Sequence, residues 1–438
     1  MKGLKSLTIC ALAVLGAVSL TGCGSTSSVS ASGSSSNSNF KVGVILVGDE
    51  SEGYTEAHIE GIKAAQTKLG LSDSQILYKK KIAEDNTVLT SANELVSNGC
   101  SLVISNSYGH QDFMETAAEN HKDVTFVADT GDYAALTGLD NFKNAFTDIY
   151  QARYVSGIVG GMKLKELIDA GKLTDSNKDS DGNYKIGYVG AFKYAEVISG
   201  YTAFFLGVQS VVSNVSMEVQ FTSSWFDIEK EGTAATALVN DGCVIIGQHA
   251  DSTGAPAACE KMLNATGADH HECYSVGYNV DMSTAAPHAA LTSATNNWGV
   301  YYEYAFKKAM DGEGKGIAKD WAEGYETNTV GLTTLTANCA TGTQTAVDTA
   351  VAGIKAGTLH VFDTSKFTVT TDGVSAAVTS NKVNLSYMDY STGTPTEVYH
   401  GDTVETVKTS GTTSYIEESV SRSAPYFSLQ TDGITWKN

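Results

Sequence analysis

The chain has 438 residues, enough for two or more domains, and its 42% hydrophobic content is typical of a globular protein with a buried core. Its formal net charge of −20 argues against binding to nucleic acid, whose phosphates attract basic surfaces. The same acidity suits a protein held near an anionic membrane by a lipid, and not one that lies on the membrane through a basic patch.

The first 23 residues have the pattern of a secretory signal. Lys2 and Lys5 precede an apolar run over residues 7–20, and a short stretch of small residues then ends at Cys23. This pattern predicts a signal peptide over residues 1–22 and a lipid on the Cys23 thiol, with an ordinary cleaved signal as the alternative. The apolar run is shorter than the ~20 residues that span a bilayer. We therefore expect a lipid-anchored protein on the extracytoplasmic face of the cell membrane.

Residues 23–39 are nearly all small and polar, which predicts a flexible tether. From Phe40 the chain alternates short apolar runs with amphipathic stretches, the pattern of parallel sheets covered by helices. Strands are predicted at 41–47, 76–78, 101–105, 124–128, 184–190, 218–221, 243–246 and 274–278, and helices at 55–69 and about 196–211. Because the pattern restarts at residue 184, the sequence indicates two similar α/β lobes.

Open α/β sheets bind ligands beyond the carboxyl ends of their strands. In this chain the segments that follow the predicted strands and begin the next helices are rich in aromatic and hydrogen-bonding side chains. The residues of this kind are Tyr54, Tyr108, His110, Tyr150, Gln151, Trp225, Phe226, Asp227, His249, Asp251, Asn279, Asp281, Asn296, Asn297 and Trp298. Flat rings with a few fixed polar groups suit a planar, polar heterocycle, although any single ring could instead serve packing.

Other motifs are weaker. Cys259 and Cys273 flank one helix-to-strand connection and form either a disulfide or two free thiols, whereas Cys100 and Cys243 open apolar strands and are expected to be buried. The Asp-rich segment 175–182 resembles a calcium loop but lacks the closing glutamate, and we expect a solvated turn. No nucleophile elbow or HExxH motif is present. We expect no metal, no cofactor and no catalysis.

Five segments in order carry a family resemblance. They are residues 147–157 (TDIYQARYVSG), 223–231 (SSWFDIEKE), 247–252 (GQHADS), 277–282 (GYNVDM) and 291–299 (LTSATNNWG). Behind a lipidation signal, this series resembles the basic membrane protein family, the purine-nucleoside-binding lipoproteins of bacterial ABC importers. The resemblance covers residues from about 40 to 362.

The resemblance implies a type I periplasmic-binding-protein fold, with two parallel-sheet α/β lobes joined by crossovers. The N-terminal lobe would comprise residues 40–150 plus about 288–320, and the C-terminal lobe 151–287 plus about 321–362. The remaining residues, 363–438, are rich in Thr, Ser and Gly with short alternating hydrophobic runs, which predicts a β-rich C-terminal tail.

By position in the family, Tyr54 takes the place of the aromatic residue that stacks on the base, and Thr55 that of its polar neighbour. Gln151 replaces an acidic residue near the sugar, Asn279 departs from an Asp-x-Asp loop that Asp281 completes, and Asn296 replaces a lysine that contacts ribose. Three departures thus cluster on the sugar side. The chain is more similar to a subgroup with tryptophan and HTDS-like loops, and this resemblance implies a free purine such as adenine. Asp251 would then accept a hydrogen bond from the exocyclic amine.

These expectations combine into a substrate-binding lipoprotein of an ABC importer that captures a purine base or nucleoside, with an adenine-like base favoured. Tyr54 and Trp225 are expected to stack on the ligand, Asp251, Asp281 and Gln151 to hydrogen-bond to it, and Tyr108 and Trp298 to form walls. The expected partners are the ligand, the permease subunits and the membrane, and the protein is expected to be a monomer. The alternatives are a sensor for a membrane kinase, an extracellular nucleoside-processing enzyme and a sugar-binding protein of the same fold.

Overall fold

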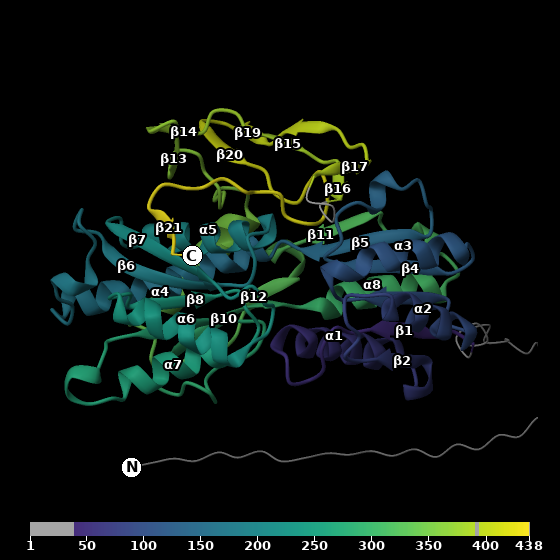
Figure 1. The fold of residues 1–438 in the computed structure, drawn as a ribbon, viewed down its shortest axis with the longest axis horizontal. Helices are drawn as coiled ribbons and strands as arrows, with labels where there is room; N and C mark the ends of the chain where they lie inside the picture. The colour runs from purple at the N-terminus through teal and green to yellow at the C-terminus, as the bar shows by residue number, and fades with distance from the viewer. Residues whose placement is uncertain (1–38, 390–393, 438) are drawn as a thin grey trace, which may run out of the picture. The chain divides into compact units, whose positions relative to one another are not determined.

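The computed structural model describes residues 39–389 and 394–437 (Figure 1). The predicted signal peptide, the lipidation site at Cys23 and the tether up to residue 38 lie outside the described residues. Within the described part, every helix is too short or too polar to cross a bilayer.

The first lobe is built on a six-stranded parallel sheet with the order β11-β5-β4-β3-β1-β2. Its strands are β1 (Val42–Ile45), β2 (Ile76–Lys79), β3 (Leu102–Ser105), β4 (Thr125–Asp129), β5 (Phe142–Thr147) and β11 (Asp320–Glu323). Its helices are α1 (Gly53–Leu69), α2 (Thr87–Ser97), α3 (Gln111–Asn120) and α8 (Trp298–Met310). Strands β1, β3, β4 and β5 are buried throughout, because helices cover both faces of the sheet.

The second lobe has a seven-stranded sheet with the order β12-β10-β9-β8-β6-β7-β21, parallel except for the β10–β12 pair. The strands are β6 (Tyr184–Gly190), β7 (Val215–Phe221), β8 (Ile245–Gln248), β9 (Tyr274–Tyr278), β10 (Ala290–Asn296), β12 (Val330–Leu332) and β21 (Ile434–Trp436). The helices are α4 (Ile149–Asp169), α5 (Ala195–Gln209), α6 (Ile228–Asn240), α7 (Gly254–Leu263) and α9 (Thr343–Lys355).

Helices α4 and α5 of the second lobe touch backbone to backbone through two glycines. A Cβ atom on Gly157 would lie 2.1 Å from the carbonyl oxygen of Phe204, and one on Gly207 would lie 2.0 Å from that of Tyr154. Only glycine permits this approach, which explains why the TDIYQARYVSG segment ends on a glycine.

Three connections cross between the lobes. The chain passes from β5 to α4 at Asp148, from β10 to α8 at Asn297, and from β11 to β12 over residues 324–329. The second crossing therefore follows Asn296, whereas the sequence-based boundary stood near residue 288, and β11 belongs to the first sheet up to Glu323. An apolar run predicts a strand but not its neighbour, because pairing depends on residues far away in the chain.

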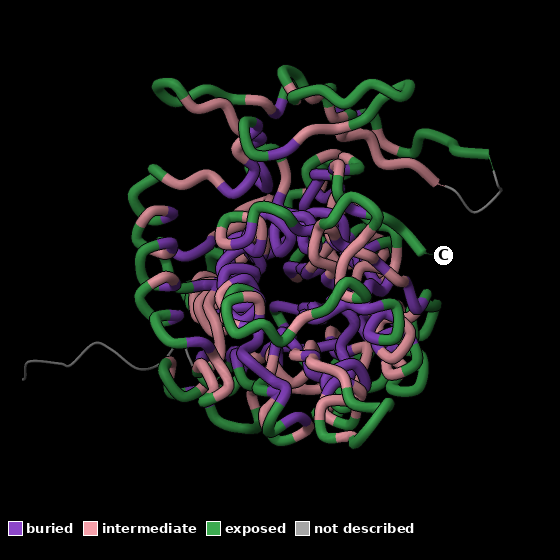
Figure 2. The backbone as a smooth tube through the Cα atoms, turned by 90° about the vertical axis from the view of Figure 1, so that its left-hand side faces the viewer, coloured by how far each residue is buried: buried purple, intermediate pink, exposed green. Residues whose placement is uncertain are grey.

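The C-terminal tail consists mainly of small antiparallel pairs. Its strands are β13 (Thr368–Thr371), β14 (Val374–Ala377), β15 (Lys382–Asn384), β16 (Tyr387–Asp389), β17 (Thr396–Tyr399), β18 (Thr403–Glu405), β19 (Val407–Ser410) and β20 (Thr413–Ile416). Figure 1 shows these strands lying above both sheets, and Figure 2 shows the tail mainly exposed or intermediate while the sheets are largely buried. Strand β21 then joins the second sheet beside β7. The predicted α/β fold with two parallel-sheet lobes and a β-rich tail is confirmed.

The carboxyl of Asp148, at the first crossing, gives a pH-dependent contribution to stability. Burial, followed by the carboxylates of Glu326, Glu418 and Glu323, raises its pKa from 3.8 to about 8. The folded protein favours the protonated form of Asp148. The contribution of this carboxyl to the free energy of unfolding is therefore fully present below about pH 4 and is lost as the pH rises toward 8. We expect Asp148→Asn to be more stable than wild type by about 2 kcal/mol at pH 8 and little changed at pH 4.

Urea unfolding at pH 4, 6 and 8 measures this difference. Asp311→Asn, on an exposed helix end, serves as the control because its carboxylate lies in solvent. Parallel pH profiles for wild type and Asp148→Asn would contradict the assignment.

Candidate functional site

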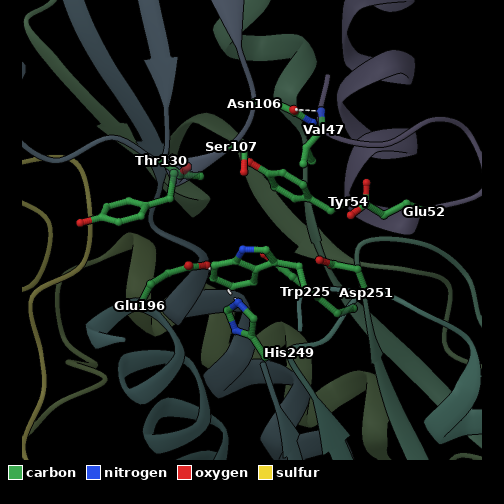
Figure 3. A pocket seen from close by; sticks show the side chains of 12 residues that line it. Val47, Glu52, Tyr54, Asn106, Ser107, Thr130, Glu196, Trp225, His249 and Asp251 are labelled. Carbon is green, nitrogen blue, oxygen red and sulfur yellow. Dashed lines mark hydrogen bonds and ion pairs between the residues drawn. The ribbon is translucent and has the colours of Figure 1, made fainter. Parts of the chain in front are cut away.

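A cavity lies between the two lobes, beyond the carboxyl ends of their strands (Figure 3). The empty space between its lining residues is about 410 Å³, including open solvent at its mouth. The first lobe contributes Val47, Glu52, Tyr54, Asn106, Ser107, Tyr108 and Thr130, and the second contributes Glu196, Trp225, His249, Asp251 and Tyr278. The position follows from the fold, because the strand ends of both sheets face the same crevice.

Two aromatic side chains project into this cavity from opposite lobes, Tyr54 from the start of α1 and Trp225 from the loop after β7 (Figure 3). The Tyr54 ring packs edge-on against His58, with the ring centroids 4.5 Å apart, and the Phe192 ring supports Trp225 at 4.8 Å. The Tyr54 hydroxyl is buried and has no hydrogen-bond partner among the described residues. These rings are placed to hold a flat ligand, with one hydroxyl left to bond to it.

Carboxyl groups from both lobes also line the cavity. The Oδ1 atom of Asp251 accepts a hydrogen bond from the Asn279 amide at 3.1 Å, and Thr55 donates to the Glu52 carboxylate. Burial raises the pKa of Asp251 well above its usual value, and the Glu52 carboxylate across the cavity adds to this effect. Burial also raises the pKa of Glu52. A ligand that donates hydrogen bonds would relieve both buried carboxyls.

Arg153 lies beneath the floor of the cavity and bonds to the second lobe, although its buried Nε has no hydrogen-bond partner among the described residues. The buried Arg153 donates to the Gln248 carbonyl at 2.6 Å and to His249 Nδ1 at 3.2 Å, and its guanidinium lies 3.5 Å from the Tyr278 ring centroid. Since Nδ1 accepts, the neutral His249 carries its proton on Nε2, which faces the Glu196 carboxylate at 3.1 Å. Burial lowers the pKa of His249, consistent with a neutral ring. Among the described residues that line the cavity there is no lysine or arginine.

Of the ten residues that the sequence indicated for the site, Tyr54, Tyr108, Trp225 and Asp251 line the cavity. Thr55 lies directly behind it and is fully buried. Trp298 faces into the first lobe, where its ring stacks on His58 with centroids 4.1 Å apart.

The remaining four indicated residues do not line this cavity: Asn279, Asp281 and Asn296 line a second hollow together with Trp298, and Gln151 lines a third. Asn296 donates to the Tyr278 hydroxyl at 3.2 Å and to Asn279 Oδ1 at 2.8 Å, while Asn279 in turn donates to Asp251. Gln151 accepts a hydrogen bond from the backbone N–H of Tyr325 at 2.9 Å, in the crossing that runs over residues 324–329. Asp281 is exposed and accepts from the backbone N–H of Ser283 at 2.8 Å.

Seven lining residues were not indicated by the sequence: Val47, Glu52, Asn106, Ser107, Thr130, Glu196 and Tyr278. His249 was named among the strand-end side chains but not among the ten site residues. Several of the seven lie within the predicted strand-end segments. The sequence therefore predicted where they lie in the fold, but not that their side chains line the cavity. Thr130 follows β4, a strand end for which the sequence showed no distinctive side chain.

The cysteines and the Asp-rich turn lie apart from the cavity. All five described cysteines are free, and Cys273 Sγ donates to the Cys259 carbonyl at 3.3 Å. Cys100 and Cys243 are buried, as predicted. In segment 175–182, Asp179 accepts from backbone N–H groups of its own turn. The described residues contain no group of three metal-ligating side chains that could hold an ion.

Comparison with known proteins identifies the family. The sequence profile of the Bmp family, described as ABC transporter substrate-binding protein PnrA-like, matches residues 40–351. The chain belongs to this family. It is therefore a solute-binding protein of an ABC transporter, and the resemblance seen in the five sequence segments is confirmed. The match ends before the C-terminal tail.

Individual Bmp-family relatives are distant. A purine-binding protein of Brucella abortus (strain 2308) is 30% identical over 277 residues, which cover 63% of this chain and 70% of the relative. The nucleoside-binding protein BmpA of Lactococcus lactis subsp. cremoris is 22% identical over 309 residues, covering 67% and 79%. An ABC transporter solute-binding protein from Aeropyrum pernix K1 has a similar fold, with a TM-score of 0.57 and 14% identity over 73% of this chain and 92% of that structure.

Proposed function

We propose that this Bmp-family protein binds a purine base, with adenine favoured, between its two lobes and delivers it unchanged to an ABC permease. The observation that carries the proposal is the lining of the cavity: aromatic rings from opposite lobes, three carboxyl groups and no cationic side chain among the described lining residues. The purine-binding relative from Brucella abortus supports the same ligand class.

The carboxyl groups favour a ligand with N–H donors. Glu52, Glu196 and Asp251 each direct hydrogen-bond acceptors toward the same small space. An anionic ligand such as a nucleotide would find three carboxyl groups and no lysine or arginine among the described lining residues, so burying its charge there would be energetically costly. Adenine offers an exocyclic amine and a ring N–H to the carboxyl groups, while its two faces remain free for Tyr54 and Trp225.

The hydrogen bonds beside the cavity favour a base over a nucleoside. Asn296, Asn279 and Asp251 form a continuous chain of hydrogen bonds, so the two amides bond to the protein itself. A ribose would have to break these bonds to gain its own partners, and each lost buried bond costs ~1–3 kcal/mol. Asn279, Asn296 and Gln151, the three departures noted in the sequence, thus have hydrogen-bond partners within the protein and need none from a sugar.

The lobes meet around the cavity, as ligand capture by closure requires. The backbone N–H of Gly53 in the first lobe donates to the Asp251 carbonyl in the second at 3.4 Å, and the Tyr108 and Tyr194 rings approach across the cleft with centroids 5.9 Å apart. Rotation about the three crossings would open this contact and release the ligand. The proposal includes no catalytic step and no cofactor.

The sequence supports the same proposal for location. The signal and the lipid on Cys23 would hold the protein at the extracytoplasmic face of the membrane, as a monomer within reach of its permease. Labelling of growing cells with a fatty-acid analogue, compared between wild type and Cys23→Ala, tests the lipid directly.

Identification of the natural ligand tests the proposed function. The purified protein is denatured and any released small molecule is identified by its mass, and the emptied protein is then ranked by thermal shift against adenine, guanine, hypoxanthine, xanthine and their ribosides. Adenine at 100 times its Kd should stabilise the fold by ~2.7 kcal/mol. A preference for ribosides would refute the base-only site, and recovery of a cleaved product would indicate an enzyme.

The buried hydroxyl of Tyr54 provides a test inside the cavity. Burial raises its pKa, so the group stays protonated and can donate to the ligand. We expect Tyr54→Phe to weaken adenine binding about fivefold while leaving unfolding stability unchanged or slightly higher, since an unpaired buried hydroxyl is destabilising. Calorimetry and urea unfolding measure the two effects, and an equal loss of both would show that the ring, and not the hydroxyl, had been disturbed.

A further inference from the structure

A loop of the C-terminal tail, residues 419–425, is anchored in the second lobe. The buried Glu418 at its base accepts from the backbone N–H groups of Tyr426 at 2.6 Å and Phe427 at 2.9 Å, which close the loop. Ser199 of α5 donates to the same carboxylate at 2.9 Å. These bonds fix both ends of the loop to the second lobe.

The tip of this loop reaches the first lobe. Ser423 donates to Asp320 of β11 from its backbone N–H at 3.1 Å and its hydroxyl at 3.0 Å. Arg422 lies beside it, and its Nη1 atom is 3.3 Å from Asp132 Oδ2, with the two side chains only 16% and 14% exposed. Arg422 also donates to the carbonyls of Ala424 and Pro425, which fixes the direction of its guanidinium.

Asp132 belongs to the segment that follows β4 and borders the ligand cavity. Two residues earlier, Thr130 lines the cavity, and its buried hydroxyl has no hydrogen-bond partner among the described residues. Thr130 has a φ of 69°, a conformation that a residue other than glycine or asparagine rarely holds without support from its surroundings. Gly131 packs so closely on Asn144 that a Cβ atom would lie 2.0 Å from its amide nitrogen.

We propose that Arg422 is a positioning residue for the ligand cavity: its ion pair with Asp132 holds the segment that presents Thr130 and forms only when the lobes are closed. The expected effect of Arg422 on ligand affinity rests on the proposed function. The expected effect on the segment around Thr130 does not depend on it. Tyr108 also lines the cavity, and the charges of both Asp132 and Arg422 act on its side chain. The ion pair therefore lies close to two lining residues, Thr130 and Tyr108.

Loss of the guanidinium would leave the Asp132 carboxylate buried without a counter-charge, and the segment would have to move to reach solvent. Because the pair joins the two lobes, its loss should speed ligand release more than it slows capture. The tail lies beyond residue 351, outside the match to the Bmp family, so this support belongs to this chain and not to the family profile.

The test compares Arg422→Met, Arg422→Lys and Asp132→Asn in the full chain. Ser423→Ala is the matched control, because it weakens the neighbouring contact of the same loop with β11. Hydrogen exchange of the amides over residues 129–134 is measured without ligand, and adenine association and dissociation rates are measured by stopped flow. We expect Arg422→Met to raise exchange in this segment and the dissociation rate about tenfold each, and Arg422→Lys to restore most of both. Ser423→Ala keeps the ion pair and the backbone bond to Asp320, so exchange over residues 129–134 should stay at the wild-type rate.

Exchange and dissociation rates at wild-type values in Arg422→Met would overturn the proposal, as would an equal rise in exchange over residues 129–134 from Ser423→Ala. If Arg422→Met fails to fold, Asp132→Asn removes the same ion pair from the other side and decides the question. If wild type binds no purine, the proposed function fails, and the exchange comparison still decides whether Arg422 holds the segment.

Discussion

Replacement of Asp251 by asparagine is expected to weaken adenine binding about 10- to 100-fold, because a hydrogen-bond acceptor that faces the ligand is replaced by a donor. Asp251 lines the cavity, and its Oδ1 atom already accepts from Asn279. Asparagine keeps this bond and the side-chain shape, but it turns an amide N–H toward the N–H groups of the ligand. The substitution therefore changes recognition with little change in packing.

Isothermal titration at pH 7 measures this effect. Asp281→Asn is the matched control, because Asp281 is also a strand-end carboxylate of the second lobe but is exposed outside the cavity. Its affinity should equal that of wild type. Equal losses in the two variants would indicate a general effect of charge, and an unchanged affinity in Asp251→Asn would remove Asp251 from the site.

Replacement of Trp225 by alanine is expected to weaken adenine binding to a similar or greater degree. Stacking of a base on an aromatic side chain contributes ~1–3 kcal/mol, which corresponds to a change in Kd of about 5- to 150-fold. Trp225→Phe retains a ring and should lose less. Phe192 and His249 pack around the indole, so the phenylalanine ring is expected to stay near its position.

Trp436→Ala is the control for this prediction, since that indole lies on β21 and bonds to Tyr201, away from the cavity. Calorimetry of the three variants and urea unfolding separate binding from stability. An affinity in Trp225→Ala equal to that of Trp436→Ala would show that the ligand does not stack on Trp225.

Much of the fold could be predicted because buried parallel strands are short apolar runs. Strands β6 and β9 begin and end at the residues predicted, and the helix predicted at 55–69 is α1 with two further residues at its start. The partner of a strand was harder to predict. The run that forms β10 pairs with β9 of the second sheet, a choice decided by packing between distant parts of the chain.

The site could be predicted in position but only partly in residues. The sequence identifies the strand-end segments, but it does not say which way a side chain turns: Trp298, at the start of α8, points into its own lobe and stacks on His58. Glu52 and Glu196 were missed because acidic residues at helix starts are common, where they interact favourably with the helix dipole. Their role becomes visible only when the two lobes are brought together.

Calorimetric titration of wild type with adenine, adenosine and D-glucose tests the central claim most directly. The account predicts one adenine bound per chain, tighter than adenosine, with no heat from glucose and with adenine recovered unchanged. Heat from glucose but from no purine or riboside would contradict it.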